Sequence, residues 1–431
     1  MADYSFSRIQ DYIAKVKNNE DVTDFLLKHP KTKEDAVKWD YKYWKTQPVT
    51  QIGKMAPLPK IINKEILNKH KEEVKMLEPY TWKNFDLNND ADMEEVVKFI
   101  NKYNVSDENS KFKYVYTKEN IKYMLSHKQN RGYIFGMTAI SNKDATSSDK
   151  NSTITGGIVC YTIKKLQLFD LIKDVGSIKY IGIHPKLRDK GLAKILINET
   201  VRRLIAMNIE VGDFRTNLYI PTPICKVEYY YRPINYKKMY ELGYVKLENV
   251  KELKRAIDEY KVDHTVKSKG VKLSSQPIEK IKQAYDILCD YQDKYNIYEK
   301  YTLEEFIHTF MNNKSISSYV ILNEDGDVQD FYSYTKYGMK SVEKNDSTDS
   351  LRVAKIHTYT STEITPLSIF KSAIIDASNE SIDLFTSTDV MENLEVLYDN
   401  FNKFVKGETF LYYNFYNWEC PELSPEQVCY Q

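Results

Sequence analysis

The chain has 431 residues, which at a usual length of about 100–200 residues per domain allows two to four domains. Hydrophobic residues make up 42% of it and charged residues 29%, so the composition is globular and excludes wholesale disorder. The 62 Lys and Arg residues are balanced by 61 Asp and Glu residues, which excludes a chain-wide positive field able to hold a nucleic acid or an anionic membrane.

Apolar runs and cysteines narrow the class of protein further. Every apolar run is far shorter than the roughly 18 residues of a membrane span. The five cysteines are widely spaced and include no Cys-x-x-Cys pair, which argues against a disulfide framework and a thiolate zinc site. We therefore expect a soluble, cytoplasmic protein without an integral membrane segment or a bound metal.

The first part of the chain predicts short helices and loops. Residues 1–40 have apolar residues at helical spacing and are predicted as a lead-in of two short helices. The aromatic cluster Tyr41–Trp44 follows, then a proline-rich stretch and a predicted helix over 63–74. The polar residues 142–152 are expected to form a solvated loop.

Three strands and a helix are predicted between residues 156 and 220. The apolar runs Gly156–Ile163 and Val175–Ile183 indicate buried antiparallel strands, the first ending at a pair of lysines. Apolar residues at i, i+3 and i+4 spacing predict an amphipathic helix over Arg188–Met207. A further strand is predicted over Val211–Ile220, where Pro221 ends it.

The second half repeats this order of elements. The prediction gives strands, a helix and a last strand over Ser317–Leu322, Gln329–Tyr334, Arg352–Thr360, Pro366–Asn379 and Ile382–Thr386. The shared strand-strand-helix-strand order indicates an internal duplication. The aromatic run Thr409–Trp418 is strand-like and is expected to close a sheet shared by the two halves.

The most specific local motif follows the strand that ends at Ile183. The residues Arg188-Asp189-Lys190-Gly191-Leu192-Ala193 have the form R-x-x-G-x-A at the start of the predicted helix. Amides at a helix N-terminus are unsatisfied and favour an anion, and a glycine lets a pyrophosphate approach the backbone. The motif predicts a phosphate cradle, the alternative being a helix that simply begins after a basic turn. After a buried strand, the motif resembles the acyl-CoA loop of GNAT acyltransferases.

Further segments, in the same order along the chain, resemble the glycylpeptide N-myristoyltransferases. They are Tyr41–Val49, Ile178–Ala193, Ile220–Pro223, Tyr229–Arg232, Asp330–Ser333, Asp389–Asn393 and Tyr416–Pro421. The resemblance implies an α+β fold of two fused GNAT-like halves around a central mixed, largely antiparallel sheet. It divides the chain into a lead-in over 1–40, a half over 41–225 that binds myristoyl-CoA, and a half over 226–431 that completes the peptide groove.

The resemblance implies myristoyl-CoA as the acyl donor and assigns residues to it. The backbone amides of Tyr180 and Ile181 are implied to form the oxyanion hole, and fixed donors suit acyl transfer because they stabilise the charge that develops on the thioester oxygen. The implied cofactor-binding residues are Lys42, Tyr43, Trp44, Tyr180, Ile181, Gly182, Ile183, Arg188, Asp189, Lys190, Gly191, Leu192 and Ala193. Surface packing is the alternative for the aromatic segment.

The implied acceptor is the N-terminal glycine of a peptide or nascent protein, and the implied general base is the C-terminal carboxylate, here that of Gln431. The implied peptide-binding residues are Asp107, Glu108, Phe112, Lys113, Tyr114, Tyr116, Tyr229 and Tyr231. The two acids would attract basic residues of a substrate or form an exposed polar turn, and the aromatic residues at 112, 114 and 116 could equally be one face of a strand. His184 is expected to be solvated or structural.

Several positions depart from the family pattern. Lys179 replaces an asparagine before the oxyanion pair, and Phe214–Asn217 replaces a Y-T-A-G segment, which places Arg215 near the amine. Tyr231 replaces a groove histidine, and Gly191 replaces a basic residue. The tail is about two residues shorter than the family pattern.

The resemblance thus implies direct attack of a glycine amine on the thioester, without an acyl-enzyme or a metal. We expect a monomer that binds no nucleic acid. Two alternatives stay open. One is a GNAT-type acyltransferase with another acyl chain or a lysine acceptor, because the residues near the amine differ. The other is a non-catalytic acyl-CoA-binding protein, which the short tail favours.

Overall fold

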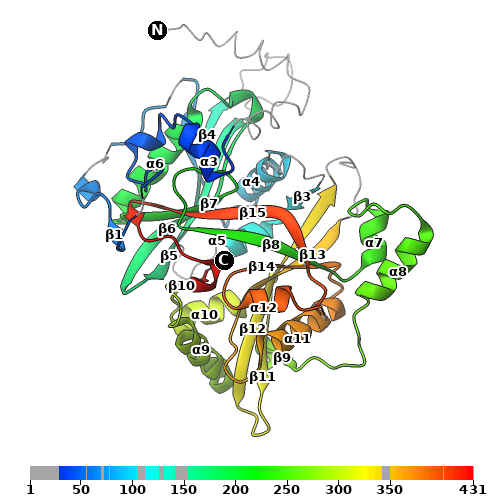
Figure 1. The fold of residues 1–431 in the computed structure, drawn as a ribbon. Helices are drawn as coiled ribbons and strands as arrows, with labels where there is room; N and C mark the ends of the chain where they lie inside the picture. The colour runs from blue at the N-terminus through cyan, green and yellow to red at the C-terminus, as the bar shows by residue number, and fades with distance from the viewer. Residues whose placement is uncertain are drawn as a thin grey trace.

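The computed structural model describes residues 29–54, 56–68, 72–76, 78–103, 112–125, 131–140, 153–341, 350–400 and 402–430. Within them one large sheet has the strand order β17-β10-β5-β6-β7-β15-β8-β14-β13-β12-β11-β9, with β4 and β2 added beside β5 and β3 beside β12 (Figure 1). Its pairs are antiparallel except β6 with β7, β13 with β14, and β10 with β17. The strands are β2 (Thr81–Phe85), β3 (Phe112–Val115), β4 (Gly132–Ile140), β5 (Thr153–Leu168), β6 (Leu171–Ile183), β7 (Val211–Thr216), β8 (Cys225–Pro233), β9 (Gly270–Lys272), β10 (Ile297–Glu299), β11 (Ile316–Leu322), β12 (Val328–Ser341), β13 (Leu351–Tyr359), β14 (Leu384–Thr388), β15 (Val405–Tyr416) and β17 (Val428–Cys429).

Two units of the sheet share one connectivity. In the first, β5 and β6 are antiparallel, α6 (Leu192–Ala206) crosses over, and β7 returns parallel to β6. In the second, β12 and β13, then α11 (Pro366–Asn379) and β14, repeat the same order and directions. β15 lies between β7 and β8 and so joins the two units. The predicted α+β fold and its shared sheet are confirmed.

Helices and short elements surround this sheet (Figure 1). Trp418 is fully buried in the largest apolar core, with Phe370 of α11 and Phe385 of β14. The remaining elements are α3 (Lys33–Lys38), α4 (Asp90–Tyr103), α5 (Lys118–Leu125), α7 (Tyr236–Glu241), α8 (Val250–Tyr260), α9 (Ile278–Gln292), α10 (Leu303–Phe310), α12 (Asn393–Leu397), β1 (Lys60–Ile61), β16 (Trp418–Glu419) and the 3-10 turns η1 (Trp44–Thr46), η2 (Ile66–Asn68), η3 (Pro185–Leu187), η4 (Leu273–Ser275) and η5 (Pro425–Gln427).

Some predicted boundaries were wrong, and side-chain partners explain the differences. β5 continues past the lysine pair to Leu168 because Lys164 is neutralised by an ion pair with Glu299 of β10. The predicted helix over 63–74 is, in its described residues, only the turn η2. There the amide of Val74 donates to the Glu199 carboxylate of α6 rather than to its own segment.

Two strands end at other residues than predicted, and two predicted segments lie wholly or partly outside the described residues. β7 ends at Thr216, four residues earlier than predicted, and β12 extends to Ser341. Of the predicted lead-in only residues from 29 onward are described, and they include the helix α3. The predicted loop over 142–152 lies outside the described residues.

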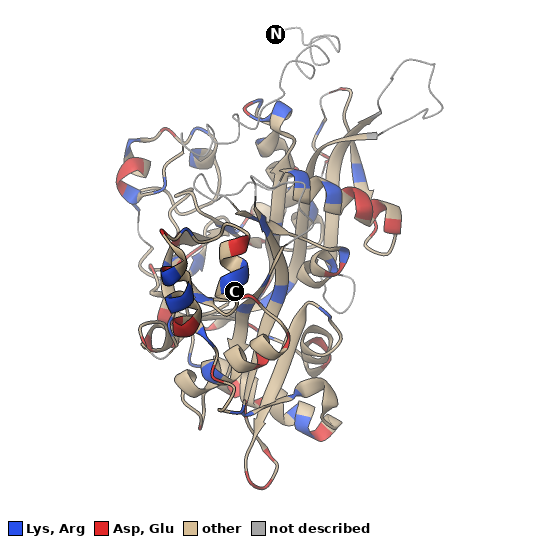
Figure 2. Ribbon diagram, turned by 90° about the vertical axis from the view of Figure 1, so that its right-hand side faces the viewer, with Lys and Arg blue, Asp and Glu red and all other residues tan. Residues whose placement is uncertain are grey.

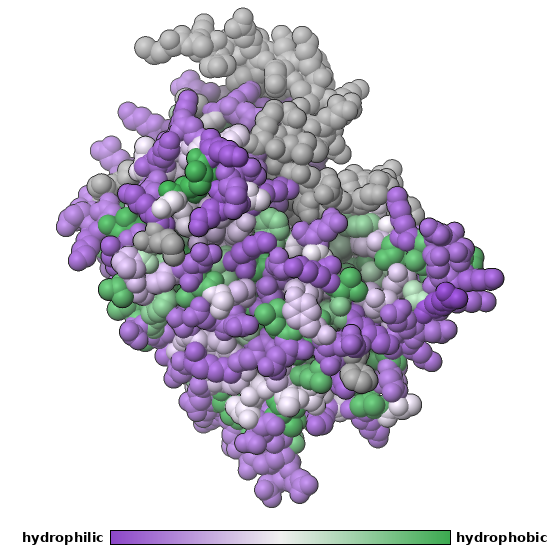
Figure 3. Space-filling view, in the orientation of Figure 1, coloured by the Kyte–Doolittle hydropathy of each residue, from purple (hydrophilic) through white to green (hydrophobic). Residues whose placement is uncertain are grey.

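The surface carries mixed charge and scattered apolar residues. Lys and Arg are interspersed with Asp and Glu over helices and strand ends (Figure 2), in keeping with the net charge of +1. On the face in Figure 3, apolar residues form small patches between hydrophilic ones. In the described part of the chain, none of the helices has the length and apolar character needed to cross a membrane.

Candidate active site

A β-bulge lies at the position where the sequence predicts the oxyanion hole. Cys160 of β5 pairs with Tyr180 of β6, but the next residue, Tyr161, pairs with Ile178. Lys179 is therefore an extra residue without a partner, and a bulge of this kind re-aims the residues next to it. The amides of Tyr180 and Ile181 follow directly.

Gly182 of β6 lies beneath the side chain of Tyr180. A Cβ atom there would lie 2.3 Å from the hydroxyl of Tyr180, whose side chain folds over it. Ile181 alternates to the other side of the strand and is 41% exposed. The side chain of Ile181 thus lies at the surface of the protein.

The loop after β6 leads into α6 through Gly191, whose φ of 76° is left-handed. A glycine adopts this angle without strain. As the N-cap of α6, Gly191 supplies no side-chain hydrogen bond to the amides of the first turn. Asp189, Lys190 and Ala193 are exposed around these amides, and Leu192 is buried.

Arg188 lies differently from the exposed phosphate-binding cation that the motif indicated. Its guanidinium donates to the backbone carbonyls of Ile183 at 3.2 Å and Tyr103 at 3.4 Å. Burial lowers the pKa of Arg188. These contacts hold the loop against the end of β6, so Arg188 supports the loop from its buried side.

His184 begins this loop and is structural. Its Nδ1 accepts a hydrogen bond from the amide of Lys186, and its ring packs 4.6 Å from that of Tyr103. Burial, with the charges of Lys186, Lys102 and Arg188, lowers the pKa of His184 to about 4. The imidazole is therefore neutral at neutral pH.

The aromatic segment near the start of the described chain packs against α6 and β7. The Tyr43 hydroxyl donates to Asn198 of α6 at 2.7 Å, and Trp44 stacks on Phe214 with 5.6 Å between ring centres. Lys42 is exposed beside them. A hollow of about 400 Å³ lies between this segment and α6, lined by Thr46, Gln47, Pro48, Asn63, Ile66, Asn198, Val201 and Tyr416.

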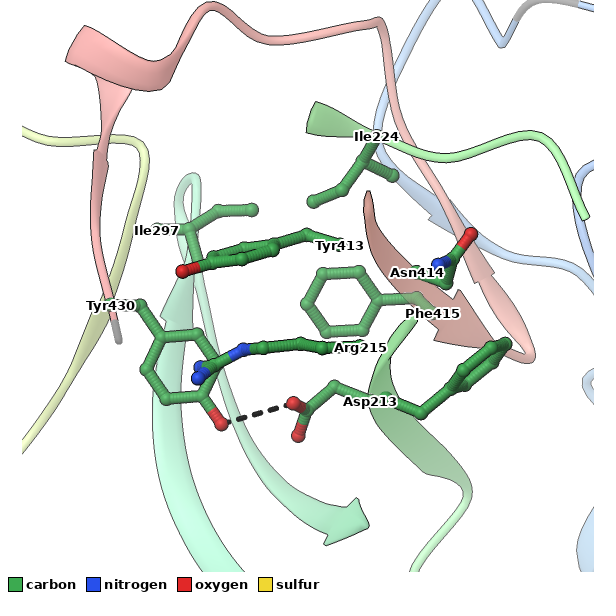
Figure 4. Close-up of a pocket in the computed structure, with 9 residues that line it drawn as sticks. Asp213, Arg215, Ile224, Ile297, Tyr413, Asn414, Phe415 and Tyr430 are labelled. Atoms are coloured by element: carbon green, nitrogen blue, oxygen red, sulfur yellow. Dashed lines mark hydrogen bonds between the residues drawn. The ribbon is translucent and has the colours of Figure 1, made fainter. Parts of the chain in front are cut away.

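The end of the chain is anchored inside the sheet. β17 pairs in parallel with β10, and Tyr430 is buried. The Tyr430 hydroxyl donates to Asp213 of β7 at 3.0 Å (Figure 4). It also lies 2.9 Å from the hydroxyl of Ser177 of β6. Gln431, the predicted general base, lies outside the described residues.

Arg215 lies beside this anchor. Its guanidinium carbon is 4.5 Å from the ring centres of both Tyr430 and Tyr413 (Figure 4). Together with Asp213 and Asn414, these residues line a small cavity with room for about one water molecule. One oxygen of Asp213, one of Asn414 and Nη2 of Arg215 are buried without a hydrogen-bond partner among the described residues.

The predicted groove residues that the structure describes form a tyrosine cluster. Burial raises the pKa of Tyr114 well above its usual range, with contributions from four neighbouring hydroxyls. These neighbours are Tyr337, Tyr229, Tyr231 and Tyr116. Phe112 stacks on Tyr244, and Tyr114 packs edge-on to Tyr337. Lys113 lies between Phe112 and Tyr114 on β3, whereas Asp107 and Glu108 lie outside the described residues.

A residue that the sequence reasoning missed lies beside the tyrosine cluster. Lys355 of β13 has its Nζ 5.1 Å from the ring centre of Tyr229. Burial and the charge of Arg215 lower the pKa of Lys355 to about 7. The sequence signal for this residue was a single lysine within a predicted, largely apolar strand. Lysines are rarely buried, so a lysine at such a position suggests a specific role.

Other site residues were also missed. Tyr337 and Tyr413 carried no distinct signal in a chain with 35 tyrosines, and Asp213 lay inside the strand predicted over Val211–Ile220. Among the described residues, no group of three or more His, Cys, Asp or Glu side chains is arranged to hold a metal ion.

The bulged strand, the glycine-capped helix and the buried chain end on one mixed sheet define an acyltransferase of the fused two-unit type. Residues 61–227 match the family described as "Myristoyl-CoA:protein N-myristoyltransferase, N-terminal domain", and residues 241–429 match its C-terminal domain. The chain belongs to the myristoyl-CoA:protein N-myristoyltransferase family.

Known proteins similar to this chain agree with that assignment. It is 28% identical to the glycylpeptide N-tetradecanoyltransferase of Drosophila melanogaster over 90% of this chain and 80% of that protein. It is 27% identical to the enzyme of the same name from Plasmodium falciparum over 95% and 98% of the two chains. Its fold matches a crystal structure of Saccharomyces cerevisiae N-myristoyltransferase with bound myristoyl-CoA, with a TM-score of 0.77, 23% identity, and coverage of 89% and 94%.

Proposed function

We propose that this protein transfers myristate from myristoyl-CoA to the N-terminal glycine amine of peptide and protein substrates. The observation that carries the proposal is the anchoring of Tyr430 on Ser177 and Asp213. Ser177 precedes Tyr180 by three residues, about 10 Å along a strand. The chain end is thereby held near the bulged strand, with the tyrosine cluster beside it.

Myristoyl-CoA would bind along the first unit. The exposed Lys190 and the free amides at the start of α6 suit the phosphates, because a helix N-terminus and a nearby cation both favour an anion. The aromatic residues Tyr43 and Trp44, of which Tyr43 donates to Asn198 in the lining of the hollow, suit the remainder of the cofactor. The amides of Tyr180 and Ile181 would both donate hydrogen bonds to the thioester oxygen.

The reaction is a direct acyl transfer. The neutral amine nitrogen attacks the thioester carbonyl carbon, a C–N bond forms, and the C–S bond breaks to release the thiolate of CoA. The nitrogen then loses its excess proton, and the thiolate takes up one proton to become the thiol of CoA. The two backbone amides stabilise the oxyanion without themselves titrating. The acceptor ammonium has a pKa of about 8 and must first lose a proton, a step we assign to the carboxylate of Gln431.

The acceptor peptide would bind along the tyrosine cluster of Tyr114, Tyr116, Tyr229 and Tyr231, with Phe112 at its edge. Asp107 and Glu108 would interact with basic residues farther along a substrate. We place the boundary between the donor-binding and peptide-binding halves at residue 225. We further propose that the protein is a cytoplasmic monomer that acts on nascent proteins and does not bind nucleic acid.

A pair of peptides tests the proposed activity. The protein is incubated with myristoyl-CoA and a peptide that begins with glycine and carries one internal lysine, or the same peptide beginning with alanine. Mass spectrometry should find myristate on the glycine amine and a loss of about 100-fold or more for alanine, because a Cβ displaces the amine from the thioester. Equal rates, or modification of the lysine in both peptides, would contradict the proposal.

A further inference from the structure

The bulge of β6 has a counterpart in the second unit. The pairing of β12 with β13 skips one residue of β13, His357, just as the pairing of β5 with β6 skips Lys179. The residues opposite the two bulges therefore correspond, so that Cys160 of β5 stands where Ser333 of β12 stands. The two units can be compared position by position from this point.

Gly157 of β5 corresponds in this way to Asp330 of β12. Both positions face the helix of their own unit. A Cβ atom added at Gly157 would lie 3.0 Å from the side chain of Leu196 of α6. In the second unit Tyr332, two residues after Asp330 and therefore on the same face of the strand, donates a hydrogen bond to Asp376 of α11.

The carboxylate of Asp330 binds the loop that leads from β13 into α11. One of its oxygens accepts hydrogen bonds from the amide of Thr362 at 2.7 Å and from the hydroxyls of Thr362 and Thr360 at 2.9 and 3.0 Å. The other accepts from the amides of Ile364 at 2.8 Å and Glu363 at 3.2 Å. Asp330 is fully buried, whereas Thr362 and Glu363 are exposed. Successive amides that point at one centre form an anion site, and here the chain's own carboxylate fills it.

The first unit has no side chain at the corresponding position. Its loop Arg188–Gly191 leads from the bulged strand into α6, and the N-cap Gly191 supplies no side-chain hydrogen bond to the first turn. A carboxylate held in such a loop excludes a phosphate in two ways, because it takes up the donors and repels the negative charge. Gly157 brings no such group to the loop of the first unit.

We infer that this pair of positions decides which unit of the fold takes a phosphate-bearing acyl donor: Gly157 leaves the first loop open, and the carboxylate of Asp330 fills the second from inside. The place of the donor in the first unit rests on the proposed function, whereas the anion site around Asp330 does not. A small phosphate ion suits the donors that hold the carboxylate, since both present negatively charged oxygen acceptors. The second unit thus contains an anion site that the native chain keeps occupied.

Removal of the carboxylate tests the second unit. Thermal unfolding of the full chain is measured in inorganic phosphate and in chloride of equal ionic strength. The proteins compared are native, Asp330→Gly, Asp330→Asn and Asp389→Gly. Asp389 is the matched control, because it is also buried and its carboxylate also accepts a backbone amide, that of Glu228 within β8.

Phosphate should raise the melting temperature of Asp330→Gly by several degrees more than that of native protein or Asp389→Gly, because a ligand that binds only the folded chain stabilises it. Asp330→Asn should be less stable than native protein but should gain nothing from phosphate, since its side chain still fills the loop. An equal effect of phosphate on all four proteins would overturn the inference.

The reverse change tests the first unit. Gly157→Asp and Gly157→Ala both place a Cβ near Leu196 and the carbonyl oxygen of Gly182, so the alanine variant reports the effect of crowding alone. Calorimetry with CoA should find binding at least tenfold weaker in Gly157→Asp than in Gly157→Ala. Equal affinities would overturn the inference, also in the case that Asp330→Gly does not fold. The proposed function fails separately, through absence of myristate on a glycine amine.

Discussion

The hydroxyl of Tyr430 donates a 3.0 Å hydrogen bond to Asp213, so the penultimate residue of the chain is tied to the middle of the sheet. Asp213 lies on β7, which pairs with β6 beside the bulge, and Ser177 on β6 completes the anchor. A terminal group held by a buried side chain is a positioned group, which a general base must be. The catalytic use that we propose for the chain end would thus depend on this contact.

Replacing Tyr430 with Phe should lower kcat by tenfold or more while leaving the affinity for myristoyl-CoA unchanged. The ring would still pack, but the hydroxyl contacts with Asp213 and Ser177 would be lost and the chain end would shift. A displacement of about 1 Å can cost about 100-fold in rate. Steady-state kinetics and calorimetry measure the two effects, and Tyr298→Phe on β10 serves as a control with a buried hydroxyl away from Asp213.

Extending the chain by a few residues after Gln431 should abolish transfer and preserve binding of myristoyl-CoA. The extension moves the carboxylate away from the amine, whereas β17 and the buried Trp418 should still anchor the tail. Rates and cofactor affinity are compared for the native and extended proteins. Full activity in an extended protein that binds the cofactor normally would refute the carboxylate as base, and a fall of only a few-fold would indicate that the tail merely covers the groove.

The two basic residues of the loop before α6 should respond differently to replacement by alanine. Lys190→Ala should weaken CoA binding by tenfold or more at an unchanged melting temperature, because its side chain is exposed and charge-assisted contacts to phosphate are worth about 1.5–3 kcal/mol. Arg188→Ala should also lower the melting temperature, because it removes donors to Ile183 and Tyr103. Calorimetry and thermal unfolding provide both readouts, and an unchanged dissociation constant in Lys190→Ala would remove it from the cofactor site.

Replacing Lys355 with Met should raise the melting temperature at neutral pH, and the gain should shrink as the pH rises. Burial and Arg215 lower the pKa of Lys355 to about 7 in the folded protein, against about 10.4 in an unfolded chain. Between these values the unfolded chain binds more protons, so native stability rises with pH. Below about pH 7 the amine of Lys355 is protonated in both states, so the full free-energy cost of burying its charge remains. Thermal unfolding from pH 6 to 10, without substrates, tests this, and a constant difference between the two proteins would contradict it.

Local sequence determined the elements and the family. Periodicity and short motifs depend on neighbouring residues, so they can be recognised in the sequence alone. This applies to the order of strands and helices in both units, the glycine that begins α6 and the segments typical of N-myristoyltransferases. The helix over Pro366–Asn379 was predicted to the residue, since Thr365 caps its start and a proline begins its first turn. The spacing of its apolar residues indicates which face of the helix is buried.

Tertiary structure decided which of these residues meet. The length of β5 depended on Glu299, more than a hundred residues away, which neutralises Lys164. Arg188 looked like an exposed phosphate ligand, yet the carbonyls of Ile183 and Tyr103 take up its guanidinium. The anchor of Tyr430 on Ser177 and Asp213, and the positions of Lys179 and Arg215 beside its ring, join segments that are far apart in the chain. Such contacts leave no local pattern, because each side chain is ordinary in its own strand and gains its role only from the neighbours that folding supplies.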